Sequence, residues 1–382
     1  MKTYFKNNQN NWIGTWVCAL QKVEKDNLIE VPDLNNKLLR QIIHTSIMGK
    51  KLRLKISNEY GQTKLCINSI SIALSNGKDS IRQETSQLLS FNGNYSVEIL
   101  SGEEVISDSI EYELPATSNL AITINLKEVP INITGHPGSR TTSYIKTGND
   151  TSTLEMTSSK KVIQWFFLKG LYVLSNESNN AIAVIGDSIT DGRGSTTDKN
   201  NRWPDNLSTR LQKNITTSDI SVLNLGIGGN SILHGGLGPT LLERLERDIL
   251  NENKVKWLII LAGVNDIGES ISKHIVNDLI EAYMNIIDMA HRKNIFVFGI
   301  PVLPFGGSQY DNDIHQYVRE KVNTWIRTSE KFDFVIDLET CICDPENKKN
   351  LSKNYDCGDH LHLNERGYKK MADEIDLNIF KN

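Results

Sequence analysis

Hydrophobic and polar residues alternate with a period of two through much of the first half of the chain. Between residues 50 and 175, apolar side chains recur at every second position in short runs, and turn sequences with Asn, Gly or Pro separate these runs. The clearest runs are Leu120, Ile122, Ile124 and Leu126; Ile70, Ile72 and Leu74; and Ile110, Tyr112 and Leu114. Many short strands at this spacing are typical of a β-sandwich or jelly roll.

From about residue 180 the pattern changes to short apolar runs alternating with segments of helical periodicity. The apolar runs predict buried strands at 182–185, 222–225, 257–261, 295–300 and 334–337. The spacing of apolar residues predicts helices at 271–292 and at about 313–327, the second one burying Ile314, Val318, Val322 and Trp325. This alternation predicts a parallel sheet with helices on both faces.

The change of periodicity falls at a polar stretch, residues 175–180, and divides the 382 residues into two domains, 1–178 and 179–382. A chain of this length is too long for one ordinary core. Because the connection is short and lacks a Pro-rich or Gly/Ser-rich linker, we expect the first domain to help build the substrate site. The polar turn 136–140, which includes Arg140, is a candidate for that role, and an ordinary surface turn is an equally good interpretation.

Composition excludes several classes of partner. A formal net charge of −4 gives no reason to expect nucleic acid, and no apolar stretch approaches the length of a membrane span.

The first residues are too polar for a secretion signal, so a cytoplasmic location is the default expectation and secretion stays open. The five cysteines are scattered, which favours reduced thiols over a disulfide framework. Nothing in the sequence indicates the oligomeric state.

Four clusters of unusual residues lie where chemistry is expected in such a sheet, at the carboxyl ends of strands and in the loop before the last helix. They are 186–192 (GDSITDG), 224–230 (NLGIGGN), 262–266 (AGVND) and 359–362 (DHLH). Taken singly, each has an ordinary structural interpretation as a turn, a helix cap or a tight backbone packing site. The glycines do not form a nucleotide-binding fingerprint, and no phosphate-binding Lys follows them.

Together, the four clusters supply the parts that acyl transfer requires. A serine hydroxyl becomes nucleophilic when a base removes its proton, and that base needs a partner that orients it. The developing negative charge on the carbonyl oxygen needs hydrogen-bond donors aimed at it. Ser188, His362 and Asp359 match the first three roles, and the Gly229 N–H and the Asn265 amide match the last.

The clusters resemble, in order, the four sequence blocks of the GDSL/SGNH hydrolase family. The matching residues are Gly186-Asp187-Ser188, Gly229 in an Asn-x-Gly-x-x-Gly context, Gly263-x-Asn265-Asp266 and Asp359-x-x-His362. The resemblance implies a flavodoxin-like three-layer α/β domain with a parallel sheet, preceded here by an all-β sandwich or jelly-roll domain. It implies a triad of Ser188, His362 and Asp359, an oxyanion hole formed by Ser188, Gly229 and Asn265, and no cofactor.

Less specific matches extend the resemblance to almost the whole chain. They include Leu52-Arg53-Leu54, residues 57–61 and Arg202-Trp203-Pro204-Asp205, and they resemble a two-domain subgroup with an N-terminal β domain. Related two-domain members are typically carbohydrate esterases that remove acetyl groups. The resemblance therefore implies a short-chain, acetyl-type esterase acting on a small-molecule or carbohydrate ester.

Several neighbouring residues have supporting roles or none in this interpretation. We expect Asp187 to shape the nucleophile turn and Asp266 to anchor the loop that carries Asn265. Cys357, Asp359, His360 and His362 are residue types that bind metals, but four ligands within six residues cannot easily surround one ion, so no metal is predicted.

Two alternatives to a carbohydrate esterase stay open. The same catalytic residues serve lipid acyl hydrolases such as lysophospholipases, although the segments 192–202 and 304–313 are polar and Gly-rich rather than apolar. A non-catalytic carbohydrate-binding protein with a vestigial site is less consistent with a complete set of Ser, His, Asp and Asn.

Overall fold

The computed structural model describes residues 11–23 and 33–381. The chain divides into two compact units. The first comprises Met1–Glu177 and Thr197–Asn200, and the second comprises Ser178–Thr196 and Asn201–Asn382. The short segment Thr197–Asn200 is held in the first unit by Asp198. The Asp198 carboxylate accepts hydrogen bonds from the Thr142 N–H at 2.6 Å and the Thr142 hydroxyl at 2.7 Å. Residues 197–200 therefore belong to the first unit, although the segments before and after them in the sequence belong to the second.

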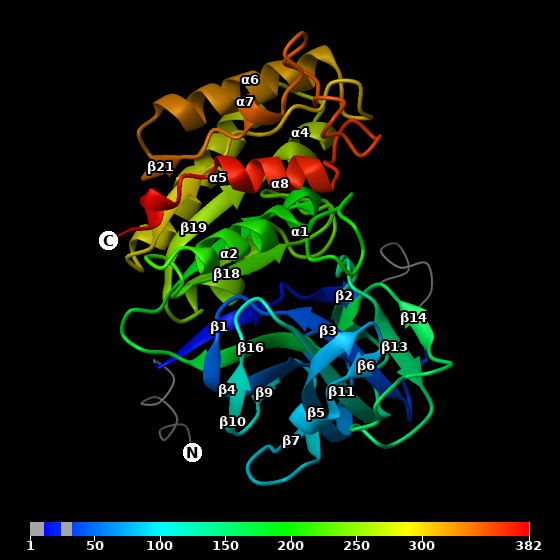
Figure 1. Cartoon of the computed structure of the whole chain (residues 1–382). Coiled ribbons are helices and arrows are strands. Elements are labelled where there is room, and N and C mark those ends of the chain that lie inside the picture. Colours follow the sequence, from blue (N-terminus) through cyan, green and yellow to red (C-terminus); the bar gives the residue numbers. More distant parts are fainter. Residues whose placement is uncertain (1–10, 24–32, 382) are drawn as a thin grey trace. The chain divides into compact units, whose positions relative to one another are not determined.

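The first unit is an all-β sandwich with antiparallel pairing throughout, which confirms the prediction from period-two alternation (Figure 1). One sheet has the order β1-β16-β4-β10 with β9 beside β4, and a larger one has the order β14-β13-β3-β11-β5-β6 with β7 and β8 beside β5. A small third sheet has the order β15-β12-β2. The strands are β1 (Trp12–Val17), β2 (Gln21–Val23), β3 (Leu38–His44), β4 (Gly49–Ser57), β5 (Leu65–Gly77), β6 (Ser80–Ile81), β7 (Gln87–Leu89), β8 (Val97–Ile99), β9 (Glu104–Ile106), β10 (Ile110–Leu114), β11 (Asn119–Glu128), β12 (Ile133–His136), β13 (Ser143–Lys146), β14 (Lys160–Val162), β15 (Trp165–Phe166) and β16 (Leu168–Leu174), with a short helix η2 (Gln83–Thr85).

Strand β11 is buried on both faces, although its sequence alternates. It lies between β3 and β5, and Leu120 and Ile122 face one core while Ala121 joins a second, smaller cluster with Tyr144 and Met156. The buried Thr123 hydroxyl accepts a hydrogen bond from Nε of Arg40 at 2.9 Å. A polar residue in an alternating strand is therefore not always a solvent-facing residue, because a second layer of chain covers this face.

The second unit is a parallel α/β domain whose sheet has the strand order β18-β17-β19-β20-β21, as the fold prediction requires. All four strand pairs are parallel. The strands are β17 (Asn180–Gly186), β18 (Ile220–Gly226), β19 (Val255–Leu261), β20 (Phe296–Gly299) and β21 (Phe334–Val335). The helices are α1 (Ser188–Asp191), α2 (Trp203–Lys213), α3 (Leu241–Leu245), η3 (Glu246–Leu250), α4 (Val264–Glu269), α5 (Ile275–His291), α6 (Asp313–Thr328), α7 (Glu339–Ile342), α8 (Glu365–Glu374) and η4 (Leu377–Phe380).

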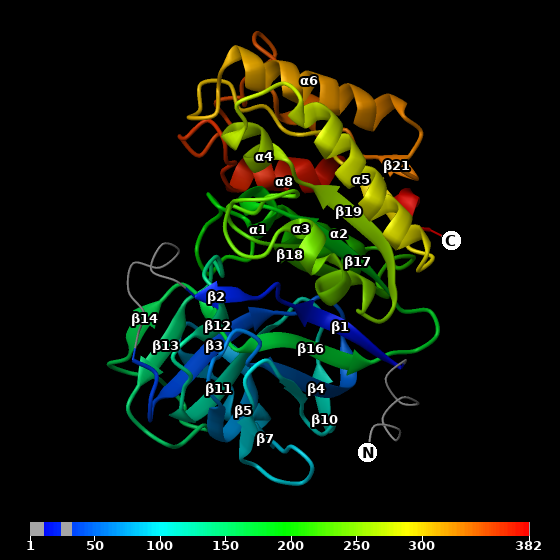
Figure 2. The same ribbon diagram turned by 180° about the vertical axis from the view of Figure 1, so that it is seen from behind.

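Helices cover both faces of this sheet, which gives the three layers expected. Helices α2 and α8 lie together on one face, and α5 lies on the other face with α3 (Figures 1 and 2). Helix α6 packs beside α5 and buries Val318 and Val322 as predicted, but Ile314 is exposed and Trp325 is only half-buried. The prediction for Ile314 was wrong because the first turn of α6 buries its neighbours His315 and Gln316 instead, so Ile314 lies on the exposed side of the helix.

Within the residues that the structure describes, no helix has both the length and the apolar character that crossing a bilayer requires. All five cysteines are free thiols.

Candidate active site

Three of the four sequence blocks lie at the carboxyl ends of three neighbouring strands. Strand β17 leads into Ser188, β18 leads into the loop with Gly229, and β19 leads into α4, which carries Asn265. Because β17 lies between β18 and β19 in a parallel sheet, these three strand ends meet at one edge. The fold therefore gathers residues from between positions 188 and 265 of the sequence.

The turn that carries Ser188 is fixed by a helix cap and by close backbone packing. Asp187 is the N-cap of α1, and its Oδ1 accepts a hydrogen bond from the Ile189 N–H at 2.9 Å. The neighbouring strand end comes very close, since a Cβ atom at Gly226 would lie 2.3 Å from the Asp191 nitrogen. Glycine at position 226 therefore lets β18 pack directly against the turn, and Ser188 is held with only 6% of its surface exposed.

Ser188, His362 and Asp359 form one continuous chain of hydrogen bonds. The Oγ atom of Ser188 lies 2.7 Å from Nε2 of His362, and Nδ1 of His362 lies 2.7 Å from Oδ2 of Asp359. The other carboxylate oxygen of Asp359 accepts from the backbone N–H groups of His362 at 2.8 Å and Leu361 at 3.1 Å. The loop before α8 thus presents the imidazole to Ser188 in one orientation.

These hydrogen bonds keep Asp359 ionised. Partial burial by itself raises the pKa of this carboxyl group, but the hydrogen bonds from the His362 N–H, the His362 ring and the Leu361 N–H outweigh burial. The pKa of Asp359 is therefore lowered from 3.8 to about 2. An ionised Asp359 accepts the Nδ1 proton of His362 and leaves the Nε2 lone pair directed at the Ser188 hydroxyl.

Two backbone N–H groups of the sequence blocks donate to no protein acceptor in the part of the chain that the structure describes. Within the described residues, neither the Ser188 N–H nor the Gly229 N–H donates to a protein acceptor. Gly229 has φ of +70°, a left-handed conformation that glycine adopts at little cost. Its neighbour Asn230 accepts a hydrogen bond through its backbone oxygen from Nδ2 of Asn265 at 2.8 Å, which holds the Asn265 amide next to the Gly229 loop.

Tyr310 contacts the same amide and was not among the residues predicted from the sequence. Its hydroxyl donates to Oδ1 of Asn265 at 3.1 Å. Tyr310 lies 45 residues after Asn265 in the loop before α6, and no motif marks it. Its location in the polar segment 304–313 that flanks the site was the available signal in the sequence.

Two buried carboxyl groups support the blocks. Both oxygens of Asp266 accept from the Ile232 N–H, and Oδ1 also accepts from the Leu233 N–H at 2.9 Å, which ties α4 to the loop after β18. Burial raises the pKa of Asp266 against the opposing effect of these N–H groups. Burial also raises the pKa of Asp187, to about 7, with smaller contributions from the neighbouring Asp266 and Asp191 carboxylates.

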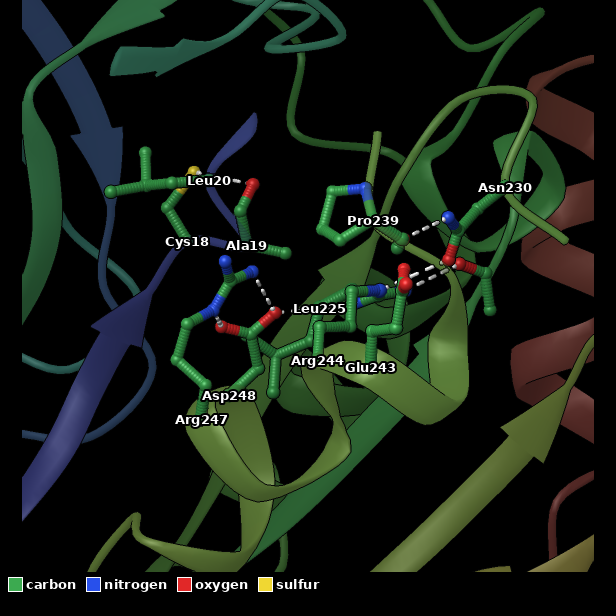
Figure 3. A network of polar contacts seen from close by, with 12 residues as sticks. Cys18, Ala19, Leu20, Leu225, Asn230, Pro239, Glu243, Arg244, Arg247 and Asp248 are labelled. Carbon is green, nitrogen blue, oxygen red and sulfur yellow. Dashed lines mark hydrogen bonds and ion pairs between the residues drawn. The ribbon is translucent and has the colours of Figure 1, made fainter. Parts of the chain in front are cut away.

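Arg244 connects the ends of two strands that lead into the blocks, and Figure 3 shows it with Leu225 and Asn230. This fully buried side chain on α3 donates from Nε to Oδ1 of Asn230 at 3.0 Å and from Nη1 to the Leu225 carbonyl at 2.7 Å. Its Nη2 donates to the Gly186 carbonyl at 3.1 Å, two residues before Ser188. Its Nη1 also lies 3.4 Å from the buried Asp248, whose carboxylate is shared with Arg247 at 2.7 Å. One guanidinium therefore links the end of β17, the end of β18 and the residue that holds Asn265.

Cys357, Asp359, His360 and His362, the residues of metal-binding type in this loop, do not point at one common position. His362 is turned to Ser188, and Nδ1 of His360 bonds to Asp356 at 2.6 Å. In the described part of the chain, Asp356, Cys357 and Asp359 place ligand atoms within 4.8 Å of one another, but this group is largely exposed and Asp359 is already bonded to His362.

The comparison with protein families agrees with the geometry of these strand ends. Residues 184–370 match the model of the GDSL-like lipase/acylhydrolase family. Residues 184–370 are a GDSL-like lipase/acylhydrolase domain. The four blocks lie inside this match, so the family resemblance found in the sequence is confirmed. Membership of this family makes the domain a hydrolase that acts on esters.

Solved structures similar to the GDSL domain are remote in sequence. A lipolytic protein of the G-D-S-L family from Desulfitobacterium hafniense is 22% identical with a TM-score of 0.41, covering 51% of this chain and 97% of that one. A catalytic mutant of the acetylxylan esterase Axe2 from Geobacillus stearothermophilus is 17% identical with a TM-score of 0.40, covering 52% and 92%. The carbohydrate acetylesterase Est24 from Sinorhizobium meliloti is 13% identical with a TM-score of 0.38, covering 51% and 95%. No curated protein matches the chain significantly.

Proposed function

We propose that the protein is a serine esterase in which Ser188 is the nucleophile, His362 the general base and Asp359 the group that orients and stabilises the imidazole. The observation that carries the proposal is the uninterrupted chain from Ser188 Oγ to His362 Nε2 and from His362 Nδ1 to Asp359 Oδ2, each link 2.7 Å long. A serine hydroxyl in this arrangement loses its proton as it attacks a carbonyl carbon.

In the first half of the reaction, Ser188 Oγ bonds to the ester carbon while its proton moves to Nε2 of His362. The negative charge on the carbonyl oxygen is stabilised by the N–H groups of Ser188 and Gly229 and by Nδ2 of Asn265. The imidazolium of His362, stabilised by the ionised Asp359, then protonates the leaving alcohol oxygen, and the acyl group stays on Ser188.

In the second half, His362 takes a proton from water, and the hydroxide oxygen attacks the acyl carbon. The tetrahedral intermediate collapses with Ser188 Oγ as the leaving group, which recovers its proton from His362. The reaction releases a carboxylic acid and needs no cofactor.

We further propose that the acyl group is short, with acetyl favoured, and that the alcohol is polar, with a carbohydrate as the leading candidate. The support comes from the loops 192–202 and 304–313. Within the described residues, the large apolar side chains that are well exposed all lie outside these two loops. A long acyl chain gains affinity by burying methylene groups against apolar surface, and these loops offer little of it.

The test is turnover of p-nitrophenyl acetate by the wild-type chain and by Ser188→Ala. We expect the variant to fold normally and to lose turnover by a factor on the order of 10⁴–10⁶, as removal of a triad nucleophile does. A variant that keeps more than roughly a tenth of the activity is incompatible with a serine nucleophile at this position, since such losses are far larger.

A further inference from the structure

The direction of the Asn265 side chain decides whether it can serve the proposed oxyanion hole. A carboxamide has an oxygen that accepts and a nitrogen with two N–H groups that donate. Only the nitrogen stabilises a negatively charged oxygen, and an amide turned by 180° would present its own oxygen and repel that charge. The side chain is 4% exposed, so the protein rather than solvent sets its direction.

Two hydrogen bonds define this direction. The Asn230 carbonyl accepts one Nδ2–H group at 2.8 Å, and the Tyr310 hydroxyl donates to Oδ1 at 3.1 Å. These two contacts use the oxygen and one N–H group of the amide. The second N–H of Asn265 has no acceptor within the described residues. That group is the one available for a substrate oxygen.

Tyr310 is held by contacts that do not depend on Asn265. Its backbone N–H donates to the Ser308 hydroxyl at 3.1 Å, and its carbonyl lies 2.6 Å from Nδ1 of His315, the buried first-turn residue of α6. Its ring packs on α4 at Gly268, where an added Cβ would lie 2.4 Å from the ring. The loop and the glycine thus bring the hydroxyl to the Asn265 oxygen.

We propose that Tyr310 is a positioning residue for the oxyanion hole: its hydroxyl fixes the Asn265 amide with Nδ2 toward the substrate and polarises the amide so that the remaining N–H is a stronger donor. This inference rests on the proposed function, because it assigns Tyr310 to the same reaction. A donor on the amide oxygen withdraws electron density from the nitrogen, so hydrogen bonds in such a chain strengthen one another.

The ionisation state of Tyr310 is compatible with this role. Partial burial raises the pKa of its hydroxyl, and the negative charges of Glu269 and Asp187 add to the increase. The hydroxyl therefore keeps its proton, and so its ability to donate, across the neutral and mildly alkaline range in which ester hydrolysis is assayed.

The experiment compares steady-state hydrolysis of p-nitrophenyl acetate by the wild-type chain, Tyr310→Phe, Asn265→Ala and the double variant. We expect Asn265→Ala to lower kcat by roughly 10²–10³ with little change in KM, as loss of one oxyanion donor does. We expect Tyr310→Phe to lower kcat by about 3- to 10-fold at unchanged KM, the factor that one neutral hydrogen bond provides. In the Asn265→Ala background, Tyr310→Phe is expected to cause no further loss.

Tyr317→Phe is the matched control. It removes a hydroxyl from a ring on α6 that is 39% exposed and packs against Lys273 and Lys321, so it is expected to leave kcat and KM unchanged. Thermal unfolding of each variant separates a loss of catalysis from a loss of folded protein.

Two results overturn the inference. One is a Tyr310→Phe variant with wild-type kcat, and the other is an equal fractional loss of kcat with and without the Asn265 side chain, which would place the effect of Tyr310 elsewhere. Ser188→Ala measured alongside keeps the two proposals apart: an active Ser188→Ala refutes the serine mechanism, whereas an inactive Ser188→Ala with an unaffected Tyr310→Phe refutes only the role of Tyr310.

Discussion

Asp359 binds His362 through both of its carboxylate oxygens: Oδ2 accepts from the ring Nδ1 at 2.7 Å, and Oδ1 accepts from the backbone N–H of the same residue at 2.8 Å. The same side chain therefore sets the position of the histidine backbone and the orientation of its ring. The three-residue spacing lets one carboxylate reach both the ring and the backbone N–H of His362.

Asp359→Asn is expected to lower kcat on p-nitrophenyl acetate by a factor on the order of 10²–10⁴ while the protein stays folded. The asparagine oxygen can still accept from the backbone, but its amide can donate to Nδ1 and stabilise the wrong tautomer of His362. The measurement is kcat together with a thermal unfolding curve.

Asp333→Asn is the control for this variant. Asp333 bonds to Nε2 of His291 at 2.8 Å in a second Asp–His pair, whose histidine is 43% exposed and which lies near the N-terminal ends of the parallel strands. We expect the activity of Asp333→Asn to match that of the wild type. If Asp359→Asn keeps wild-type kcat, Asp359 is not the partner of the catalytic base.

Asp187 makes the stability of the protein depend on pH. Its pKa is about 7 in the folded protein, above the ordinary value of 3.8 that it regains on unfolding. Between about pH 4 and pH 7 the unfolded carboxyl has lost its proton and the folded one has not. The unfolded state therefore binds fewer protons, and the free energy of unfolding falls as pH rises through this range.

Asp187→Asn removes this titration and keeps an oxygen that accepts from the Ile189 N–H. We expect the variant to be more stable than the wild type at pH 8 by on the order of 2–4 kcal/mol, with the difference vanishing towards pH 4. Urea unfolding at pH 4, 6 and 8 measures it. Asp376→Asn, which changes the exposed cap of η4, is the control and should show no such trend. A stability difference that is the same at all three values contradicts the buried-carboxyl argument.

The polar loops beside the site predict a preference for short acyl groups. We expect p-nitrophenyl acetate to be hydrolysed with a higher kcat/KM than the octanoate, because these described loops carry none of the well-exposed large apolar side chains against which a buried methylene gains ~0.8 kcal/mol. The measurement is kcat/KM for the series from C2 to C8, followed by acetate release from acetylated sugars. A rate that climbs steadily with chain length favours the lipid acyl hydrolase alternative.

Local sequence patterns determined the positions of many strands and most of the candidate site residues. Alternation between residues 110 and 126 indicated strands of a sandwich, and strands β17, β18 and β19 lie where short apolar runs predicted them. Ser188, Gly229, Asn265 and His362 were identified as candidates because each lies in a recognisable block. These features depend on residues close together in the sequence, so a pattern of a few positions contains them.

Only the tertiary structure identified Tyr310 and Arg244, because their partners are distant in sequence: Tyr310 meets Asn265 across 45 residues, and Arg244 meets Gly186 across 58. The exposure of Ile314 and the burial of both faces of β11 were equally undetermined, since each depends on what other chain segments cover that surface. Periodicity states which side chains share a face of an element. What packs against that face, and which buried polar atoms find partners there, follows from the folded arrangement of the whole unit.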